Sequence, residues 1–259
     1  MSASPRPPIL DVRDVTVRFG GIVALDRVSF QVEPGGIVGL IGPNGAGKTT
    51  LFNCLSRLYT PNEGAILFDG GSLLSTRPYR ISGLGIGRTF QDLAMFRSMT
   101  VLQNVMVGMH SKARSGFFAH ALRLRGVSGE ERITRERAYE SLEFLGVSAY
   151  AHQLVEGLPF GLLKRVEVAR ALVSRPKLLL LDEPAGGLNH EEVEALVKLI
   201  RTIRDTFQLT VLLVEHHMNL VMQVSEKVVV LDFGKCIADG PPAAVQRDPA
   251  VIQAYLGGH

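Results

Sequence analysis

One eight-residue segment limits the fold of this chain more than any other. Gly42-Pro-Asn-Gly-Ala-Gly-Lys48-Thr49 matches the pattern G-x-x-x-x-G-K-[ST]. It follows a short apolar run, Ile37 to Ile41, and precedes apolar residues spaced for a helix at Leu51, Leu55 and Leu58. A strand, a glycine-rich loop and a helix in this order open a parallel α/β sheet. The sequence therefore predicts an α/β fold built around a phosphate-binding loop.

The residues of this loop suit the phosphates of Mg-ATP. Glycines let backbone N–H groups point inward around phosphate oxygens, and the start of the next helix adds a favourable dipole. Lys48 is expected to neutralise charge on the β- and γ-phosphates, and the Thr49 hydroxyl to coordinate Mg²⁺. The residues predicted to bind ATP are Gly42, Pro43, Asn44, Gly45, Ala46, Gly47, Lys48, Thr49 and Thr50.

A second apolar run, Leu178 to Leu181, ends in Asp182 and Glu183. This order places Asp182 at the carboxyl edge of the sheet, where ligands of open α/β folds bind, and Asp182 suits the Mg²⁺ shell. Glu183, one step further, can orient and deprotonate the attacking water. Strands often end in charged residues, so the run indicates ATP hydrolysis only in combination with the phosphate loop.

Three other residues have both a functional and a structural interpretation, and a fourth, His217, has only a structural one. Gln91, in Arg-Thr-Phe-Gln, can bind Mg²⁺ or water, or be an ordinary loop amide. His216 follows a buried strand and can contact the γ-phosphate, although a single histidine in that place is usually structural. His217 is expected to be exposed without a role. Phe19 can stack on adenine or pack in a core as a strand residue.

Further strands are predicted on both sides of these motifs. Val15 to Phe19 and Val28 to Phe30 alternate with polar residues and predict antiparallel strands near a sheet edge. Val211 to Val214 and Val228 to Leu231 are short apolar runs that predict buried strands.

The middle of the chain, from residue 96 to residue 174, loses the strand patterns. Ala138, Leu142 and Leu145 are spaced for one buried helix face. The sequence therefore predicts a helical lobe inserted into the sheet domain.

A helix is predicted from Glu191 to Arg204, after the two carboxylates. Asn189 and Glu192 fit a capping box at its start. The tail from Pro241 onward is expected to close with one short helix. The apolar stripe of the long helix consists of Val193, Val197, Ile200 and Ile203.

The composition excludes several classes of protein. The chain has 259 residues, 46% of them hydrophobic, which is enough to bury a full core. No stretch reaches the roughly 18 apolar residues that a membrane span needs, and the N-terminus lacks the apolar core of a secretory signal, so the chain is expected to stay in the cytosol. Cys54 and Cys236 are predicted to be buried free thiols.

The charge balance does not favour nucleic acid as a partner. The formal net charge is only +3, and the densest basic stretch, Arg123 to Arg137, is interspersed with glutamates. A protein that follows phosphates concentrates lysine and arginine on one surface. No nucleic-acid partner is therefore expected.

Five segments together resemble ABC transporter ATP-binding subunits in their order and spacing. They are Gly42 to Thr49, Gln91, Leu158-Pro-Phe-Gly-Leu162, Leu178 to Glu183 and His216, and the resemblance covers nearly the whole chain. Arg-Thr-Phe-Gln, Ala-Gly-Gly-Leu-Asn and the ending Asp-Pro-Ala-Val-Ile-Gln-Ala-Tyr-Leu-Gly are similar to the branched-chain amino-acid importer branch. The resemblance implies an ATPase that powers the import of branched-chain or related amino acids.

The resemblance also implies a fold, that of a P-loop NTPase of the ABC type. Such a domain has a mixed sheet core with an antiparallel β edge and an inserted helical lobe. Over residues 1–259 it would be one ATP-binding domain, with residues 1–95 and 175–259 as the catalytic core. Residues 96–174 would form the helical subdomain that carries the signature segment.

Several partners are implied in the same way. Two ATPase subunits would meet head to tail, with each ATP between one subunit's phosphate loop and the other's signature segment. Two transmembrane permease subunits and an extracytoplasmic solute-binding protein would complete the complex, with this chain peripheral on the cytoplasmic side of the inner membrane. Phe19 would stack on adenine, His216 would hold the γ-phosphate, and Phe96 to Val107 would line the groove for a permease helix.

The signature segment departs from the usual L-S-G-G-Q. Pro159 replaces Ser, Phe160 replaces the first Gly, and Leu162 replaces Gln. Pro159 offers neither a hydroxyl nor an N–H and is expected as the first residue of a helix, and Asn189 stands where Asp is usual. We therefore predict a heterodimer with a related ATPase and two unequal sites. The residues expected to face the partner's ATP are Leu158, Pro159, Phe160, Gly161 and Leu162.

Two other interpretations stay open. The chain could be an ABC ATPase with another role, in an exporter or in the repair of nucleic acid. It could also be a P-loop kinase or a nucleotide-binding regulator, although neither explains Gln91, the signature segment and His216 together.

Overall fold

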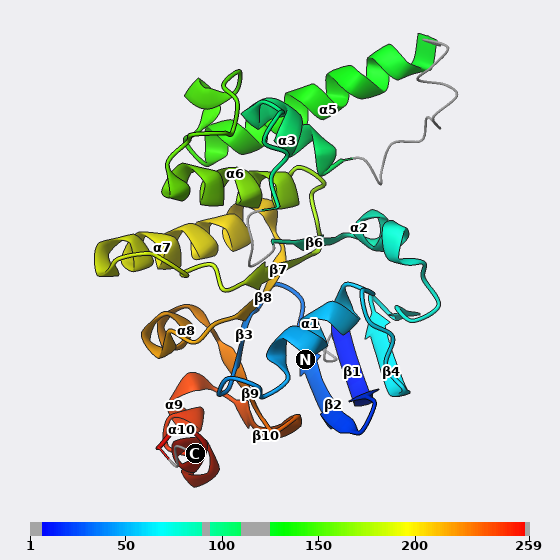
Figure 1. Cartoon of the computed structure of the whole chain (residues 1–259), viewed down its shortest axis with the longest axis vertical. Helices are drawn as coiled ribbons and strands as arrows, with labels where there is room; N and C mark the ends of the chain where they lie inside the picture. Colours follow the sequence, from blue (N-terminus) through cyan, green and yellow to red (C-terminus); the bar gives the residue numbers. More distant parts are fainter. Residues whose placement is uncertain (1–6, 90–93, 110–124, 257–259) are drawn as a thin grey trace, which may run out of the picture. The chain divides into compact units, whose positions relative to one another are not determined.

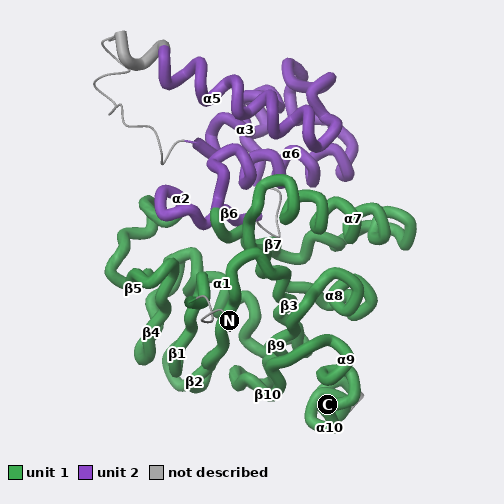
Figure 2. Tube along the Cα trace, turned by 180° about the vertical axis from the view of Figure 1, so that it is seen from behind, with its two compact units in different colours: residues 1–81, 177–259 green, residues 82–176 purple. Residues whose placement is uncertain are grey.

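The computed structural model describes residues 7–89, 94–109 and 125–256. Two compact units make up the chain (Figure 2). The first consists of residues 1–81 and 177–259, and the second of residues 82–176. The sequence placed the start of the inserted segment at residue 96, whereas the second compact unit begins earlier and includes the short strand β6 (Ile86–Arg88).

An antiparallel sheet opens the first unit, with the strand order β2-β1-β4-β5. Residues of β1 and β2 pair from Leu10 opposite Val32 to Phe19 opposite Ile22, so the predicted antiparallel pair is confirmed. Val15 and Val17 are buried, but the polar Thr16 between them is buried as well, so burial here does not follow the alternation of the sequence. The strands are β1 (Leu10–Phe19), β2 (Ile22–Val32), β4 (Glu63–Phe68) and β5 (Gly71–Ser72).

The second sheet of this unit runs in the order β10-β9-β3-β8-β7. Its neighbours pair in parallel except β10, which is antiparallel to β9. Every residue of β3, β7 and β8 is buried, as expected of strands covered on both faces. The strands are β3 (Ile37–Ile41), β7 (Leu178–Asp182), β8 (Thr210–Val214), β9 (Lys227–Asp232) and β10 (Lys235–Gly240).

Three helices of the first unit follow strands of this sheet (Figure 1). They are α1 (Lys48–Leu55), α7 (His190–Phe207) and α8 (Met218–Val224). The capping box predicted for α7 is confirmed. The Asn189 side chain accepts the Glu192 N–H at 3.0 Å, and the Glu192 carboxylate accepts the Asn189 N–H at 2.8 Å.

Helix α1 is shorter than its sequence pattern predicted. It ends at Leu55, because Arg57 adopts a left-handed φ of 60° that a helix cannot continue. Leu58 is 57% exposed, so its expected place on the buried face of the helix was wrong. Cys54 is buried on α1, and burial raises the pKa of its thiol to about 11.

The tail contains two helices, α9 (Pro242–Val245) and α10 (Pro249–Leu256), where the sequence predicted one. Both pack against β10. A second correction concerns Cys236, which lies on β10 and is only half-buried, whereas a buried thiol was expected.

The second unit holds the helices α3 (Val101–Val107), α5 (Arg125–Phe144) and α6 (Phe160–Leu172), which pack against one another. Ala138, Leu142 and Leu145 are all buried, which confirms the predicted inner face of α5 and its end. Two short turns of helix, η1 (Pro78–Arg80) and α2 (Ile81–Leu84), precede β6, and η3 (Ser148–Tyr150) follows α5.

Candidate ATP-binding and hydrolysis site

Three parallel strands bring the predicted site residues to one edge of the first unit. Leu40 of β3 and Asp182 of β7 both pair with Val214, the last residue of β8, which lies between them. The segments that follow the three strands therefore start at the same level. They are the phosphate loop after β3, Glu183 after β7 and His216 after β8.

Two glycines of the phosphate loop are required by its close packing. Gly42 has φ 151°, and a Cβ there would lie 2.1 Å from the Leu231 carbonyl oxygen. Gly47 has φ 101°, and a Cβ there would lie 2.6 Å from the Ala24 carbonyl oxygen. Any other residue would displace the backbone of a neighbouring strand or turn, so the loop's path depends on these glycines.

The Lys48 ammonium folds over the loop that precedes it. Nζ donates to the carbonyl oxygens of Gly42 at 2.7 Å and Pro43 at 2.9 Å. Burial lowers the pKa of Lys48, and the nearby Glu183 carboxylate opposes this change. A buried cation held by neutral carbonyls fits an anionic ligand, because a phosphate would supply the countercharge that these carbonyls lack. Thr49 is exposed at the start of α1, and Thr50 is half-buried.

The two carboxylates after β7 lie in different surroundings. Asp182 is buried at the end of its strand, in register with Val214. Glu183 has φ 46°, in the left-handed region, and its N–H donates to the Val214 carbonyl at 3.0 Å. Its side chain is 23% exposed, so it is open to water. A buried carboxylate and a partly solvated one, side by side, suit metal binding and base catalysis respectively.

His216 lies next to the predicted base. Its Nδ1 is 3.9 Å from Oε1 of Glu183, and half of its side chain is exposed. The structure thus brings together Lys48, Glu183 and His216, as the sequence motifs suggested.

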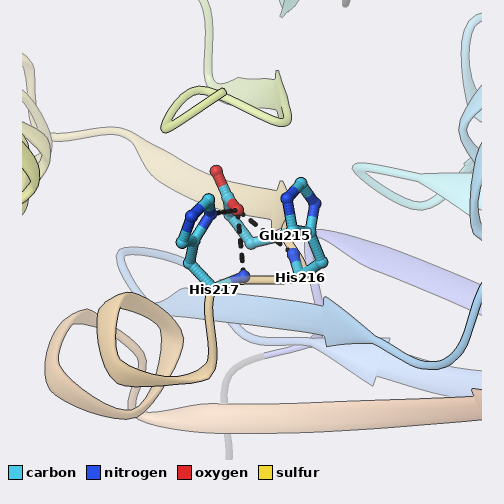
Figure 3. Close-up of side chains that lie close together, drawn as sticks. All are labelled: Glu215, His216 and His217. Carbon is cyan, nitrogen blue, oxygen red and sulfur yellow. Dashed lines mark hydrogen bonds and ion pairs between the residues drawn. The ribbon is translucent and has the colours of Figure 1, made fainter. Parts of the chain in front are cut away.

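Two neighbours of this histidine extend the site (Figure 3). Sequence reasoning missed Glu215, and it expected His217 only to be exposed. Nδ1 of His217 lies 3.3 Å from Oε2 of Glu215, and its ring packs 4.6 Å from that of His216. The His217 side chain is 42% exposed, in keeping with the expected exposure, but it also contacts Glu215 and the ring of His216. The ligand atoms of Glu215, His216 and His217 lie within 4.8 Å of one another, but Glu215 also accepts backbone N–H groups.

Phe19 lies at the end of β1 and is 47% exposed. Its ring meets Tyr59 edge to face, with the centroids 5.2 Å apart. The interpretation of Phe19 as an ordinary core residue is therefore wrong, and its exposed face can stack on a base. Gln91 lies outside the residues that the structure describes.

The signature segment starts α6 in the second unit. Pro159 has an extended ψ of 144° and precedes the first helical residue, so its predicted place inside the helix is wrong by one position. Its carbonyl accepts the N–H groups of Leu162 and Leu163. Phe160 is 48% exposed, with the Lys164 ammonium 5.6 Å from its ring centroid. Nothing crowds the Cα of Gly161, and Leu158 is half-buried.

A comparison with protein-family models decides the family. Residues 25–186, which include the phosphate loop, the signature segment and Glu183, match the family described as ABC transporter. The chain belongs to the ABC transporter family. As an ABC ATP-binding subunit it binds ATP and hydrolyses it to power transport. Residues 235–259 match a second model, described as branched-chain amino acid ATP-binding cassette transporter.

Relatives of this ABC ATPase are similar over almost their whole length. It is 41% identical to the high-affinity branched-chain amino acid transport ATP-binding protein BraF of Pseudomonas aeruginosa, over 96% of this chain and 98% of the relative. Identity to LivG of Escherichia coli K12, whose name is otherwise the same, is 40% over the same shares. A crystal structure of the ADP conformation of MJ1267, an ATP-binding cassette of an ABC transporter, matches with a TM-score of 0.83 and 29% identity. That match covers 98% of this chain and all of the other.

The comparisons agree with the fold and family that the sequence motifs predicted. Among the described residues of this ABC ATPase, no helix is both long and apolar enough to cross a membrane. The predicted ATPase fold, with its mixed sheet, antiparallel sheet and helical elements, is confirmed.

Proposed function

We propose that this chain is the ATP-hydrolysing subunit of an importer for branched-chain or related amino acids. The observation that carries the proposal is the agreement of two matches. BraF and LivG, named as branched-chain amino acid transport ATP-binding proteins, align with this chain over 98% of their own length. Residues 235–259 match a family model described as branched-chain amino acid ATP-binding cassette transporter. Residues 1–259 then act as one ATP-binding domain, with the helical segment 96–174 inserted into the catalytic core.

The phosphate loop, together with Lys48 and Phe19, would hold the nucleotide. Backbone N–H groups of residue 42 and residues 44–50 surround the phosphates, and the buried Lys48 ammonium turns from the loop carbonyls to the β- and γ-phosphates. The exposed face of Phe19 stacks on adenine.

Three oxygen-bearing side chains would suit a magnesium ion. The Thr49 hydroxyl, the buried Asp182 carboxylate and the Gln91 amide offer the oxygen ligands that Mg²⁺ prefers. When bound, Mg²⁺ neutralises charge on the phosphate oxygens.

Glu183 and His216 divide the remaining chemistry between them. The partly solvated Glu183 carboxylate orients a water and takes its proton as that water attacks the γ-phosphorus. His216, 3.9 Å from Glu183, donates a hydrogen bond to the γ-phosphate and so fixes it in line with this water.

The chain would work with unequal partners. Leu158 to Leu162 offer few polar groups to a second ATP, so a related ATPase with a complete signature segment is the better partner for this phosphate loop. Two permease subunits and an extracytoplasmic solute-binding protein complete the importer, with Phe96 to Val107 receiving a permease helix. These contacts hold the chain on the cytoplasmic side of the inner membrane as a peripheral subunit, and nucleic acid has no part in the cycle.

The test is ATP hydrolysis by the complete complex in lipid, with the solute-binding protein added. Binding protein loaded with leucine, isoleucine or valine is expected to stimulate hydrolysis, and binding protein loaded with a charged amino acid is not. The Glu183→Gln variant is expected to bind ATP but to show no stimulation. Stimulation by another class of solute would contradict the amino-acid assignment, and normal turnover in Glu183→Gln would contradict the catalytic one.

A further inference from the structure

Glu215 is a carboxylate buried without any exposed surface, directly after β8. An ionised carboxylate is costly to bury unless hydrogen bonds replace its hydration. An apolar residue would continue the buried run of β8 without this cost. The contacts of Glu215 therefore call for an explanation.

Both oxygens of Glu215 accept backbone N–H groups, and they do so from two different segments. Oε1 accepts the N–H of Ala185 at 2.7 Å. Oε2 accepts the N–H groups of His216 at 3.1 Å and His217 at 3.3 Å (Figure 3). One side chain thus ties the segment after β7 to the segment after β8.

The first segment is the one that holds Glu183 in an unusual conformation. Glu183 has φ 46°, and a non-glycine residue in the left-handed region costs on the order of 1 kcal/mol. Its own N–H is bonded to Val214, and two residues later the Ala185 N–H is bonded to Glu215. The strained residue is therefore held on both sides by β8 and its extension.

The second segment carries His216. Its backbone N–H is fixed by the same carboxylate, and its ring lies 3.9 Å from Glu183. A shift of either segment would change the distance between base and histidine, and catalytic groups lose efficiency when displaced by about 1 Å.

We propose that Glu215 is a positioning residue that holds Glu183 and His216 in fixed register for ATP hydrolysis. This inference rests on the catalytic roles given to Glu183 and His216 in the proposed function. Glu215 itself, fully buried, does not contact the nucleotide.

Glu215, His216 and His217 could also be regarded as metal ligands because of their proximity. A metal ion on Glu215 would compete with three backbone N–H groups that the carboxylate already accepts. These bonds favour the positioning role over a metal site.

The variant Glu215→Gln tests the proposal with least change in shape. An amide has one oxygen and one NH₂ group, so one of the two segments would face a donor instead of an acceptor. We expect kcat to fall about tenfold, equivalent to roughly 1.4 kcal/mol, while KM for ATP changes less than about twofold. Glu215→Asp, which keeps the charge but is one methylene shorter, should give the same split.

Glu226→Gln is the control, although the Glu226 side chain is 56% exposed and also pairs with Arg204. Glu226 also accepts a strand N–H, that of Ile37 at 3.0 Å, but at the opposite end of the parallel strands. It should leave kcat and KM unchanged. Equal losses in the Glu215 and Glu226 variants, or a loss of ATP affinity that matches the loss of kcat, would overturn the proposal.

A double-mutant cycle asks whether Glu215 acts through the histidine. In a His216→Ala background, Glu215→Gln should cost clearly less than the tenfold loss of kcat expected in the wild-type background, because one of the two groups that it positions is gone. A full tenfold loss in that background would overturn the proposal. If Glu183→Gln abolishes turnover and Glu215→Gln does not affect it, only this inference fails; if Glu183→Gln turns over normally, the proposed function fails first.

Discussion

The chain begins two helices at places where an ABC ATPase is expected to meet ATP, and the two starts differ in chemistry. Helix α1 begins after Gly47 and α6 after Pro159, and neither has a side-chain cap. At the first start the residues that follow are a cation and a hydroxyl, Lys48 and Thr49. At the second they are Phe160 and Gly161, followed by leucines.

The two helix starts differ in what surrounds their backbone N–H groups. Both starts present backbone N–H groups, which attract anions. Only the first adds a buried ammonium whose pKa is lowered by desolvation, and glycines whose positive φ no other residue tolerates in that space. We infer that the first start can hold ATP by itself, whereas the second contributes only to a site completed by another subunit.

The largest expected effect on ATP binding comes from removing the cation at the start of α1. Lys48→Ala should weaken ATP binding about 10- to 100-fold, because a charged hydrogen bond contributes about 1.5 to 3 kcal/mol. Calorimetric titration with ATP measures the change. Lys177→Ala is the control, because Lys177 also pairs with a carboxylate, that of Asp69 at 2.5 Å, but it precedes β7 at the opposite end of that strand from Glu183. Equal affinity in wild type and Lys48→Ala would remove the basis of the comparison.

A smaller effect is expected where the adenine would lie. Phe19→Ala should weaken ATP binding about tenfold, as an aromatic contact with a base contributes about 1 to 3 kcal/mol, and Phe19→Tyr should bind normally. Inorganic tripolyphosphate, which has no base, should bind wild type and Phe19→Ala equally. If tripolyphosphate binding falls as well, Phe19 supports the fold rather than the nucleotide.

The comparison can be sharpened by repairing its weaker side. The double variant Pro159→Ser, Leu162→Gln should raise ATP hydrolysis by the chain alone about fivefold, since one regained hydrogen bond contributes about 1 kcal/mol. Leu163→Gln is the control, because it places the same amide one residue later in the helix, at the half-buried Leu163. No increase in the double variant would mean that side chains of this segment do not limit the chain's activity.

A third helix start provides the smallest test. Unlike α1 and α6, α7 has a capping box between Asn189 and Glu192. Asn189→Ala should lower the free energy of unfolding by about 1 kcal/mol, whereas Asn189→Asp keeps the acceptor and should not. Thermal unfolding followed by circular dichroism measures both. If Asn189→Asp destabilises the chain as much as Asn189→Ala, the side-chain cap is not what stabilises this helix.

Local sequence patterns predicted the phosphate loop and the elements on either side of it. The strand, the glycine loop and the helix are consecutive in the sequence. The sequence pattern alone therefore indicated where each of them lies. The second tail helix could have been found in the same way, because Asp248 before Pro249 is a helix start, and its carboxylate accepts the Ala250 N–H at 2.8 Å.

Contacts between distant segments were beyond such reasoning. Glu215 bonds to Ala185, 30 residues earlier, and the sequence alone gives no sign that a carboxylate after β8 is buried. The prediction for Leu58 was wrong because Arg57 adopts a left-handed φ and ends the helix before the apolar spacing does. Phe19 alternates like a core residue but lies at the end of its strand, where 47% of its surface is exposed.

The unequal roles proposed for the two helix starts can be tested in the proposed complex with a related ATPase. Glu183→Gln in this chain and the matching glutamate-to-glutamine change in the partner ATPase are compared by steady-state ATP hydrolysis. We predict that Glu183→Gln lowers turnover roughly 10²- to 10⁴-fold, as expected for a lost general base, while the partner's variant costs only a few-fold. Equal losses in the two variants would contradict the account.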